Sequence, residues 1–362
     1  MHRFILRSVF VVTILSLGLA AAAPVGATPP GSTFAVTPLV SDQAGVAPTT
    51  DTHLVNAWGL ARSGTSPWWV ADNGTSVSTL YNAAGTPFPL PPAMPLVVNV
   101  PTNPTGVVFA GVANNFTVPT DTDPTLTAAS FIFDTESGAI LGWRGGANAK
   151  VAPVSVDAGA VFKGLTIAKL PDGSPLLYAT DFHNAKVDVF DGSWHKASIT
   201  GTFTDPLVPS GFAPFGIQAS GSDIFVTYAK QDADAHDDVA GMSLGFVDEY
   251  DLEGNLVARV ATRGQLNSPW GLAIAPASFG AFGGDLLVGN FGNGAINAYT
   301  NASGEWEYDG ALRNTEGKKL IIDGLWALQF GNAGNNGSPG TLFFTAGPDD
   351  ESHGLFGTIL PS

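Results

Sequence analysis

The sequence predicts an all-β fold, a six-bladed β-propeller, from two observations. A short phrase containing a glycine recurs six times, each time beside an apolar segment that reads as a strand. Successive glycines are 47 to 58 residues apart, and a period near 50 filled with strands is typical of propeller blades. Only 13% of the 362 residues are charged, whereas 44 are glycine and 26 proline, which favours turns and strands over amphipathic helices. The six glycines are Gly59, Gly106, Gly164, Gly216, Gly271 and Gly324.

The first segment of the chain, residues 1–27, is expected to be a secretory signal peptide. Two arginines precede an apolar run over 9–23, and small residues follow at 25–27, which is the order of such a peptide. An uncleaved membrane anchor is the alternative, but the run is shorter than the roughly 20 residues that span a bilayer. We therefore expect 28–362 to be one propeller domain, secreted to the extracellular space, or periplasmic where an outer membrane exists.

Each unit contains a second strand, a polar turn and a third strand. Residues 68–72 and 78–82 fill these places in the first unit, and apolar and polar residues alternate over 186–191 of the third, which is the period of a strand. The fourth unit carries an insertion at 230–238, and the second, over 104–143, is the least regular. The remaining expected strands include 129–134, 176–181, 223–228, 245–251, 285–290, 295–299, 341–345 and 354–359.

The segment 33–37 is expected to close the ring. It reads as a strand but precedes the first glycine phrase, whereas the last unit runs out of chain before an outermost strand. Pairing of 33–37 into the last blade would remove an exposed sheet edge. The glycines are expected to let neighbouring backbones approach near the axis, with the aromatic residue or proline beside each glycine packed between blades.

In these strands and turns the sequence resembles NHL-type six-bladed propellers. Residues 69–74 match the end of the second strand of such repeats well, and 178–181 and 288–290 match it loosely. Six-bladed lactonases, esterases and an amidating lyase, which share this architecture, hold a metal at the mouth of the central channel. The resemblance therefore implies the fold and a place where a ligand would bind.

More narrowly, the chain resembles an uncharacterised family of exported bacterial proteins, some of which end in a PEP-CTERM sorting tail. The resemblance rests on 56–60, 228–234 and 353–357, and extends over the chain after the signal peptide. The chain stops at 361–362 without an apolar helix or a basic end, so we do not expect sorting by such a tail. This family implies a fold but no established activity.

The charge and composition exclude several classes of function. Loss of residues 1–27 moves the formal net charge from −16 to −18, and so acidic a protein repels nucleic acid and anionic membranes. No cysteine is present, which excludes disulfides, thiolate metal sites and a cysteine nucleophile. Phosphate-loop, zinc-protease and serine-hydrolase motifs do not occur. We expect a monomer without a membrane span once the signal peptide is cleaved.

The insertion 230–238 is a candidate cation site. Four of its side chains alternate as they do in a calcium loop, and carboxylate oxygens suit Ca²⁺ or another divalent cation. The loop is not an EF-hand, because Asp237 stands where glycine is required and no glutamate follows at the twelfth position. An acidic surface loop without a ligand, or a loop that docks a partner, are the alternatives. The candidate ligands are Asp232, Asp234, His236 and Asp238.

Six polar residues in or beside the turns after the second strands form a second candidate site. In a propeller these turns lie on one face around the channel mouth, where loops from many blades can share a ligand. Aspartate and asparagine are also common turn formers, which is the alternative, although imidazole is unusual in a tight turn. The residues are Asp72, Asn73, Asp181, His183, Asn290 and His353.

Two functions follow from these observations. The first is an exported, non-enzymatic binding or scaffold propeller that recognises a protein, glycan or other extracellular component through one face. The alternative is a metal-dependent hydrolase or lyase, with its site at the channel mouth. It would use Asp72, Asp181, His183 and Asn290, together with the acidic insertion.

Overall fold

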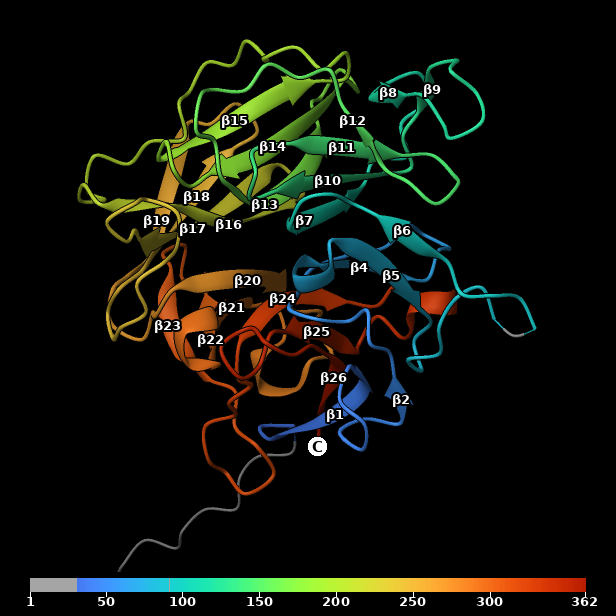
Figure 1. Cartoon of the computed structure of the whole chain (residues 1–362). Coiled ribbons are helices and arrows are strands. Elements are labelled where there is room, and N and C mark those ends of the chain that lie inside the picture. The colour runs from blue at the N-terminus through green and yellow to red at the C-terminus, as the bar shows by residue number, and fades with distance from the viewer. Residues whose placement is uncertain (1–30, 91) are drawn as a thin grey trace, which may run out of the picture.

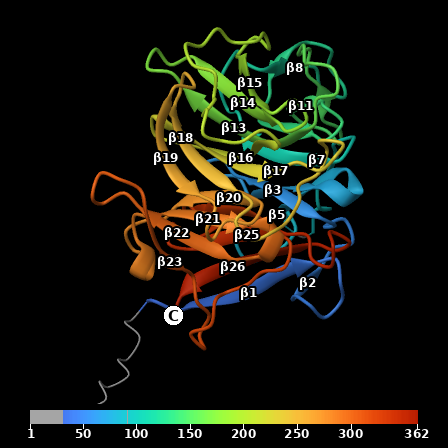
Figure 2. The ribbon, with the colours of Figure 1, turned by 90° about the vertical axis from the view of Figure 1, so that its left-hand side faces the viewer.

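The fold is a ring of six small β-sheets around one axis, which confirms the predicted six-bladed propeller (Figures 1 and 2). The computed structural model describes residues 31–90 and 92–362, so the expected signal peptide lies outside the described residues. Four 3-10 turns are the helical elements of the described part: η1 (Asn73–Thr75), η2 (Gly280–Phe282), η3 (Phe291–Asn293) and η4 (Gly334–Asn336). None of the described helices has the length or the apolar character to cross a bilayer.

Each blade begins with an inner strand at its glycine phrase, and the six inner strands contact one another around the axis. They are β3 (Ala57–Ala61), β7 (Pro104–Phe109), β13 (Phe162–Lys169), β16 (Phe212–Ser220), β20 (Pro269–Ile274) and β24 (Leu325–Phe330). The second strands are β4 (Trp68–Asp72), β10 (Phe131–Thr135), β14 (Pro175–Asp181), β17 (Asp223–Lys230), β21 (Leu286–Asn290) and β25 (Leu342–Ala346).

The third and outer strands complete the blades by antiparallel pairing. The third strands are β5 (Val77–Tyr81), β11 (Ile140–Trp143), β15 (Lys186–Asp191), β18 (Phe246–Asp251), β22 (Ile296–Thr300) and β26 (Leu355–Pro361). Four blades add the outer strands β6 (Val97–Asn99), β12 (Lys150–Val151), β19 (Leu256–Thr262) and β23 (Glu307–Ala311). The less regular second unit contains an extra hairpin of β8 (Thr117–Val118) and β9 (Thr127–Ala128).

The N-terminal strand closes the ring, as predicted. β1 (Phe34–Ser41) pairs antiparallel with β26, from Phe34 opposite Pro361 to Ser41 opposite Leu355, and β2 (Thr49–Thr50) pairs parallel with β1. Figure 1 shows the two ends of the described chain side by side in this blade. The third strand of the last blade is therefore covered by β1 rather than left as a free sheet edge.

Every inner strand carries a register shift at its glycine phrase. Such a β-bulge re-aims one side chain and bends the strand. A β-carbon added to Gly59 or Gly164 would lie 2.5 Å from the Thr105 oxygen or 2.8 Å from the Phe215 oxygen of the next blade, so close backbone approach requires glycine there. The residues at the bulges are Trp58, Thr105, Lys163, Phe215, Trp270 and Trp326.

The aromatic bulge residues gather with one another at the axis, rather than packing only between neighbouring blades as expected. We call Trp58, Phe215, Trp270, Trp326 and Phe291 the aromatic plug. The ring centroids of Trp58 and Trp326 lie 3.8 Å apart, and those of Trp326 and Phe291 lie 3.9 Å apart. The plug separates a polar cluster at one end of the channel from a cavity at the other.

The sixth glycine phrase has a different register from the first five. Gly324 precedes β24 with a φ of 61°, and Ala327 stands directly after the bulge residue Trp326, where other blades have glycine. The repeat is therefore preserved in the position of the bulge and not in the glycine itself.

Candidate functional site

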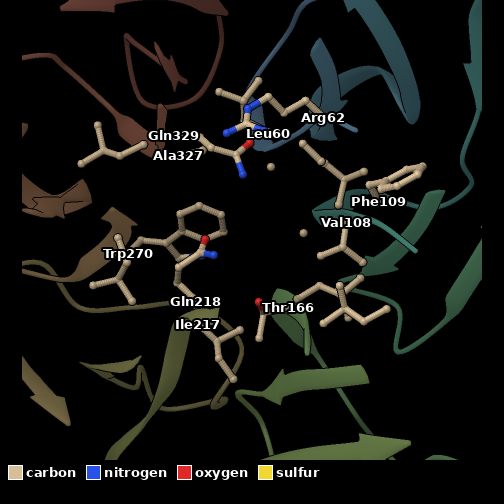
Figure 3. A pocket seen from close by; sticks show the side chains of 18 residues that line it. Leu60, Arg62, Val108, Phe109, Thr166, Ile217, Gln218, Trp270, Ala327 and Gln329 are labelled. Carbon is tan, nitrogen blue, oxygen red and sulfur yellow. The ribbon is translucent and has the colours of Figure 1, made fainter. Parts of the chain in front are cut away.

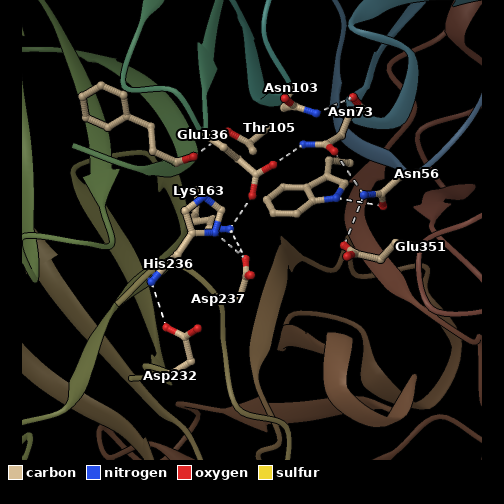
Figure 4. Close-up of polar contacts among 12 residues, drawn as sticks. Asn56, Asn73, Asn103, Thr105, Glu136, Lys163, Asp232, His236, Asp237 and Glu351 are labelled. Atoms are coloured by element: carbon tan, nitrogen blue, oxygen red, sulfur yellow. Dashed lines mark hydrogen bonds and ion pairs between the residues drawn. The ribbon is translucent and has the colours of Figure 1, made fainter. Parts of the chain in front are cut away.

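Polar side chains from five blades meet above the aromatic plug, on the face where the inner strands begin (Figure 4). The turns after the second strands lie on the same face, because each inner strand runs away from it and each second strand returns to it. We call this group the mouth cluster. Its members are Asn56, Asn73, Glu136, Lys163, His236, Asp237 and Glu351.

Lys163 is the central member of the mouth cluster. It is the bulge residue of β13, and its side chain is only 2% exposed. Its Nζ donates to Glu136 Oε1 at 2.5 Å and to Asp237 Oδ1 at 3.1 Å, and it lies 5.2 Å from the centroid of the Trp58 ring. Burial lowers the pKa of Lys163, but Glu136 and Asp237 outweigh burial and the net pKa is raised. Lys163 therefore stays a cation.

Two asparagines extend the network from Glu136 to Glu351. Asn73 Nδ2 donates to Glu136 Oε2 at 2.9 Å, and Asn56 Nδ2 donates to Asn73 Oδ1 at 3.3 Å and to Glu351 Oε1 at 3.2 Å. Asn56 Oδ1 accepts the indole N–H groups of two plug tryptophans, at 2.9 and 3.0 Å. Because an indole N–H can only donate, these bonds fix which way the Asn56 amide faces.

The acidic insertion contributes the exposed members of the mouth cluster. Asp237 and His236 have side chains 64% and 46% exposed, and His236 Nδ1 lies 2.9 Å from Asp237 Oδ1. Burial raises the pKa of Asp237, but the Lys163 cation outweighs it and the net pKa is lowered. Burial raises the pKa of Glu351 and Asp238. The mouth thus carries more carboxylates than cations.

Three possible metal ligands also meet here. One ligand atom each from Glu136, His236 and Asp237 lies within 4.8 Å of the others. However, the Lys163 ammonium group already binds two of these residues, and a divalent cation among them would face a like charge at short range. The observed arrangement is an ion network with an internal cation, and a metal would require Lys163 to move.

The structure distributes the six predicted turn residues among different surroundings, and only Asn73 joins the mouth cluster. Asp72 is buried at the end of β4, where burial raises the pKa of its carboxyl. Asp181 accepts backbone N–H groups of Val161 and Asn184, which is the local capping expected of a turn former. These placements match the turn interpretation for Asp181, and ligand binding by the set stays a prediction.

The side chains of the other three turn residues do not join the mouth cluster, although the His353 backbone oxygen accepts the Asn56 N–H at 3.0 Å. Asn290 Nδ2 donates to the Gln265 oxygen at 2.8 Å. His183 is exposed beside Gly159. His353 Nδ1 lies 2.8 Å from Asp42 Oδ2, and so ties the last blade to the segment that follows β1. His353 thus has a structural partner where the sequence suggested a ligand.

Of the four candidate ligands in the insertion, His236 alone belongs to the group of three close ligand atoms. Asp232 Oδ1 accepts the His236 backbone N–H at 2.9 Å, which shapes the loop, and Asp234 is exposed. The backbone of Asp238 forms an antiparallel β-bridge with that of Gln231 at the base of the loop. A cation site in the insertion stays a prediction.

Sequence reasoning missed Asn56, Glu136, Lys163, Asp237 and Glu351 as a group. Lys163 offered one signal, because it stands at the bulge position where four of the six blades have tryptophan or phenylalanine. Glu136 is 27 residues from Lys163 and Asp237 is 74 residues from it. No local pattern therefore connects these partners.

Comparisons with known proteins place the chain among viral relatives. No family model matches the sequence. An uncharacterized protein of Acanthamoeba polyphaga mimivirus, L690, is 27% identical over 346 residues, covering 91% of this chain and 86% of the relative. The soluble aldose sugar dehydrogenase of Escherichia coli, in its apo form, has a TM-score of 0.52 at 11% identity, covering 91% of this chain and 100% of that chain. This second likeness shows the propeller fold alone.

A further relative from the same virus, the uncharacterized protein R648, is 30% identical over 339 residues. The alignment covers 91% of this chain and 80% of the relative. The predicted resemblance to exported bacterial proteins is not tested by these viral relatives. With nearly the whole propeller aligned at this identity, the chain belongs to the same family as the mimivirus protein R648.

Proposed function

We propose that this chain is an exported, non-enzymatic binding propeller that recognises a protein with a basic surface through the face of the mouth cluster. One observation carries the proposal: Lys163 lies between Glu136 and Asp237 as an internal cation, which leaves Asp237 and His236 presented outward from a rigid network. The sequence allows glycans and other extracellular components as partners as well, but the excess of carboxylates at the mouth favours a cationic partner, because charge complementarity steers association.

The alternative, a metal-dependent hydrolase or lyase, is favoured by the close approach of Glu136, His236 and Asp237. Metal analysis of the purified chain, with thermal melts before and after chelation, separates the two functions. Bound metal in stoichiometric amount, together with a lower Tm after chelation, would favour the metal-dependent enzyme. For the binding propeller we expect the same Tm in both melts.

The binding function can be tested with a lysine-rich peptide and its glutamate-rich counterpart, each immobilised on a sensor surface. We expect the chain to bind the lysine-rich peptide, and the double variant Asp237→Asn, Glu351→Gln to bind at least fivefold more weakly. The matched control is Asp172→Asn, Glu253→Gln, which removes the same charge from loops on the opposite face and should bind within twofold of wild type. Equal losses in both variants would mean that no particular face binds the peptide.

Export can be tested by expressing the full chain in a host with a general secretory pathway. We expect the secreted protein to begin at Thr28, because the small residues at 25–27 precede this position. Intact mass measurement of the exported protein is the readout. A full-length chain retained in the membrane fraction would instead favour the uncleaved anchor.

A further inference from the structure

The central channel contains a cavity on the opposite side of the aromatic plug from the mouth cluster (Figure 3). Its volume is about 200 Å³, and residues of all six inner strands line it. Most of its lining is polar, but Leu60, Val108 and Ile217 contribute apolar side chains, and Trp270 of the plug forms part of its boundary. Because every blade contributes, the cavity follows from the fold and not from one loop.

Arg62 lines this cavity and is the one charged residue among its described lining residues. Its Nε donates to the Phe330 oxygen at 2.9 Å, and its Cζ lies 5.5 Å from the centroid of the Trp68 ring. These contacts hold the guanidinium group while leaving both Nη groups available. Arg62 has no carboxylate partner within 4.0 Å among residues 31–90 and 92–362. Burial lowers the pKa of Arg62, but an arginine remains charged in proteins.

Gln329 adds a second unsatisfied polar group to the same cavity. Its Oε1 is buried and has no hydrogen-bond partner in the described part of the chain. Buried polar atoms without partners are uncommon and call for an explanation, such as a bound molecule. In Figure 3 the side chains of Arg62 and Gln329 both extend toward the cavity. A neighbouring hollow shares Arg62, Gln218 and Gln329 with the cavity, so these side chains border both.

We propose that this cavity binds a small hydroxycarboxylate, with the Arg62 guanidinium group as the anchor of its carboxylate and Gln329 Oε1 accepting a hydrogen bond from its hydroxyl group. Guanidinium presents two parallel N–H groups that match the two oxygens of a carboxylate. One arginine compensates one negative charge, so a monoanion suits the cavity better than a dianion within an acidic protein. A water molecule occupies about 30 Å³ in the liquid, so the cavity suits a molecule of a few heavy atoms. The side chains of Leu60, Val108 and Ile217 can pack against a short aliphatic chain.

This site is separate from the proposed protein-binding face, because the aromatic plug lies between them. Its partner differs in chemistry, since the mouth cluster offers carboxylates and the cavity offers a cation. A failure of the lysine-rich peptide to bind would therefore leave the carboxylate site untouched, and the reverse also holds.

The test measures binding of lactate and 3-hydroxybutyrate to the full chain by ligand-observed NMR, with their amides, lactamide and 3-hydroxybutyramide, as uncharged counterparts. We expect the carboxylates to bind at least tenfold more tightly than the amides. Arg62→Met should weaken carboxylate binding at least tenfold. The matched control is Arg263→Met: Arg263 is also stacked on an aromatic ring, 5.4 Å from the centroid of Phe246, but does not line this cavity. Arg263→Met should leave the affinity for the carboxylates within twofold of wild type.

Several outcomes would overturn the proposal. These are equal binding of acid and amide, equal loss in Arg62→Met and Arg263→Met, or inorganic phosphate binding more tightly than the carboxylates. If Arg62→Met does not fold, the comparison of acid and amide on the wild-type chain decides, together with Gln329→Met. That second variant should weaken carboxylate binding at least threefold while leaving Tm within a few degrees.

Discussion

Lys163 and the three plug tryptophans have the same backbone role but opposite chemistry. Each stands at a β-bulge of an inner strand, so its side chain is directed toward the axis. In three blades that side chain is tryptophan and fills the channel, whereas in the third blade it is a cation that needs carboxylates. Glu136 and Asp237 supply them from neighbouring blades. The lysine that replaces an aromatic residue at this repeated position thus creates the polar mouth above the apolar plug.

A second informative residue is Asp134, a buried carboxyl at the end of β10. Its Oδ1 accepts Thr105 Oγ1 at 2.9 Å and the Gly106 N–H at 2.5 Å, which holds the bulge of β7. Burial raises the pKa of Asp134 to about 6, against an ordinary value of 3.8, although these hydrogen bonds lower it. The folded state therefore binds the proton more tightly than the unfolded state does, and wild type loses stability as pH rises from about 4 to about 6.

We predict that Asp134→Asn removes this loss. Asparagine keeps the acceptor oxygen but cannot ionise, so the variant should match wild type near pH 4 and become more stable than wild type by up to about 3 kcal/mol near pH 7. Urea unfolding at several pH values measures the difference. Asp123→Asn is the control, because hydrogen bonds from Thr125 lower the pKa of the exposed Asp123, and the same gain should not appear. A variant that is less stable at pH 7 than at pH 4 relative to wild type would contradict the prediction.

At the scale of the element, threonines of the second strands connect one blade to the next. Thr180 Oγ1 donates to the Phe215 oxygen at 2.7 Å, and Thr345 Oγ1 donates to the Trp58 oxygen at 2.5 Å. Both acceptors are bulge residues in the following blade. The bulge therefore serves two purposes: it directs a side chain into the channel, and it exposes a backbone oxygen to the neighbouring blade.

The close approach of blades predicts that Gly216→Ala is destabilising. A β-carbon at Gly216 would overlap the backbone oxygen of Trp270, in the next inner strand. Because a backbone atom cannot rotate away, we expect a loss of about 1–3 kcal/mol in the free energy of unfolding. The control is Gly64→Ala, since nothing lies within 4 Å of a β-carbon at Gly64. Urea denaturation of both variants tests this, and equal stabilities would show that the blades can separate without cost.

At the scale of the whole molecule, ring closure depends on residues far apart in the sequence. β1 covers the edge of β26, and Phe34 and Val40 of β1 are fully buried. The blade that closes the ring thus joins the two ends of the described chain. The ring can therefore close only after β26 has been synthesised.

Removal of β1 should therefore destabilise the whole propeller. A chain that begins at Asp42 loses two buried side chains worth about 4 kcal/mol together and exposes the edge of β26 to aggregation. A chain that begins at Thr33 keeps β1 and is the control. Thermal melts and size-exclusion chromatography of both chains are the measurements. Equal Tm values and equal elution would mean that β26 closes the ring without β1.

The parts of this structure that could be predicted are those that repeat or lie close together in sequence. The glycine phrases and alternating strands gave the number of blades, and the unpaired segment at 33–37 gave the closing strand. The candidate site was less accessible to sequence reasoning. The turns were placed on the right face, but of the residues proposed there only Asn73 and His236 belong to the mouth cluster.

The sequence by itself determined the six-bladed ring, because period, strand alternation and turn residues are local properties that each blade repeats. Only the tertiary structure decided which side chains meet at the axis. The bulges that direct Trp58, Lys163 and Trp326 inward, the carboxylates that surround Lys163, and the unpaired Arg62 in the cavity all depend on blades brought together by ring closure. Ion pairs and cavities form between residues that are distant in sequence, so no local pattern specifies them.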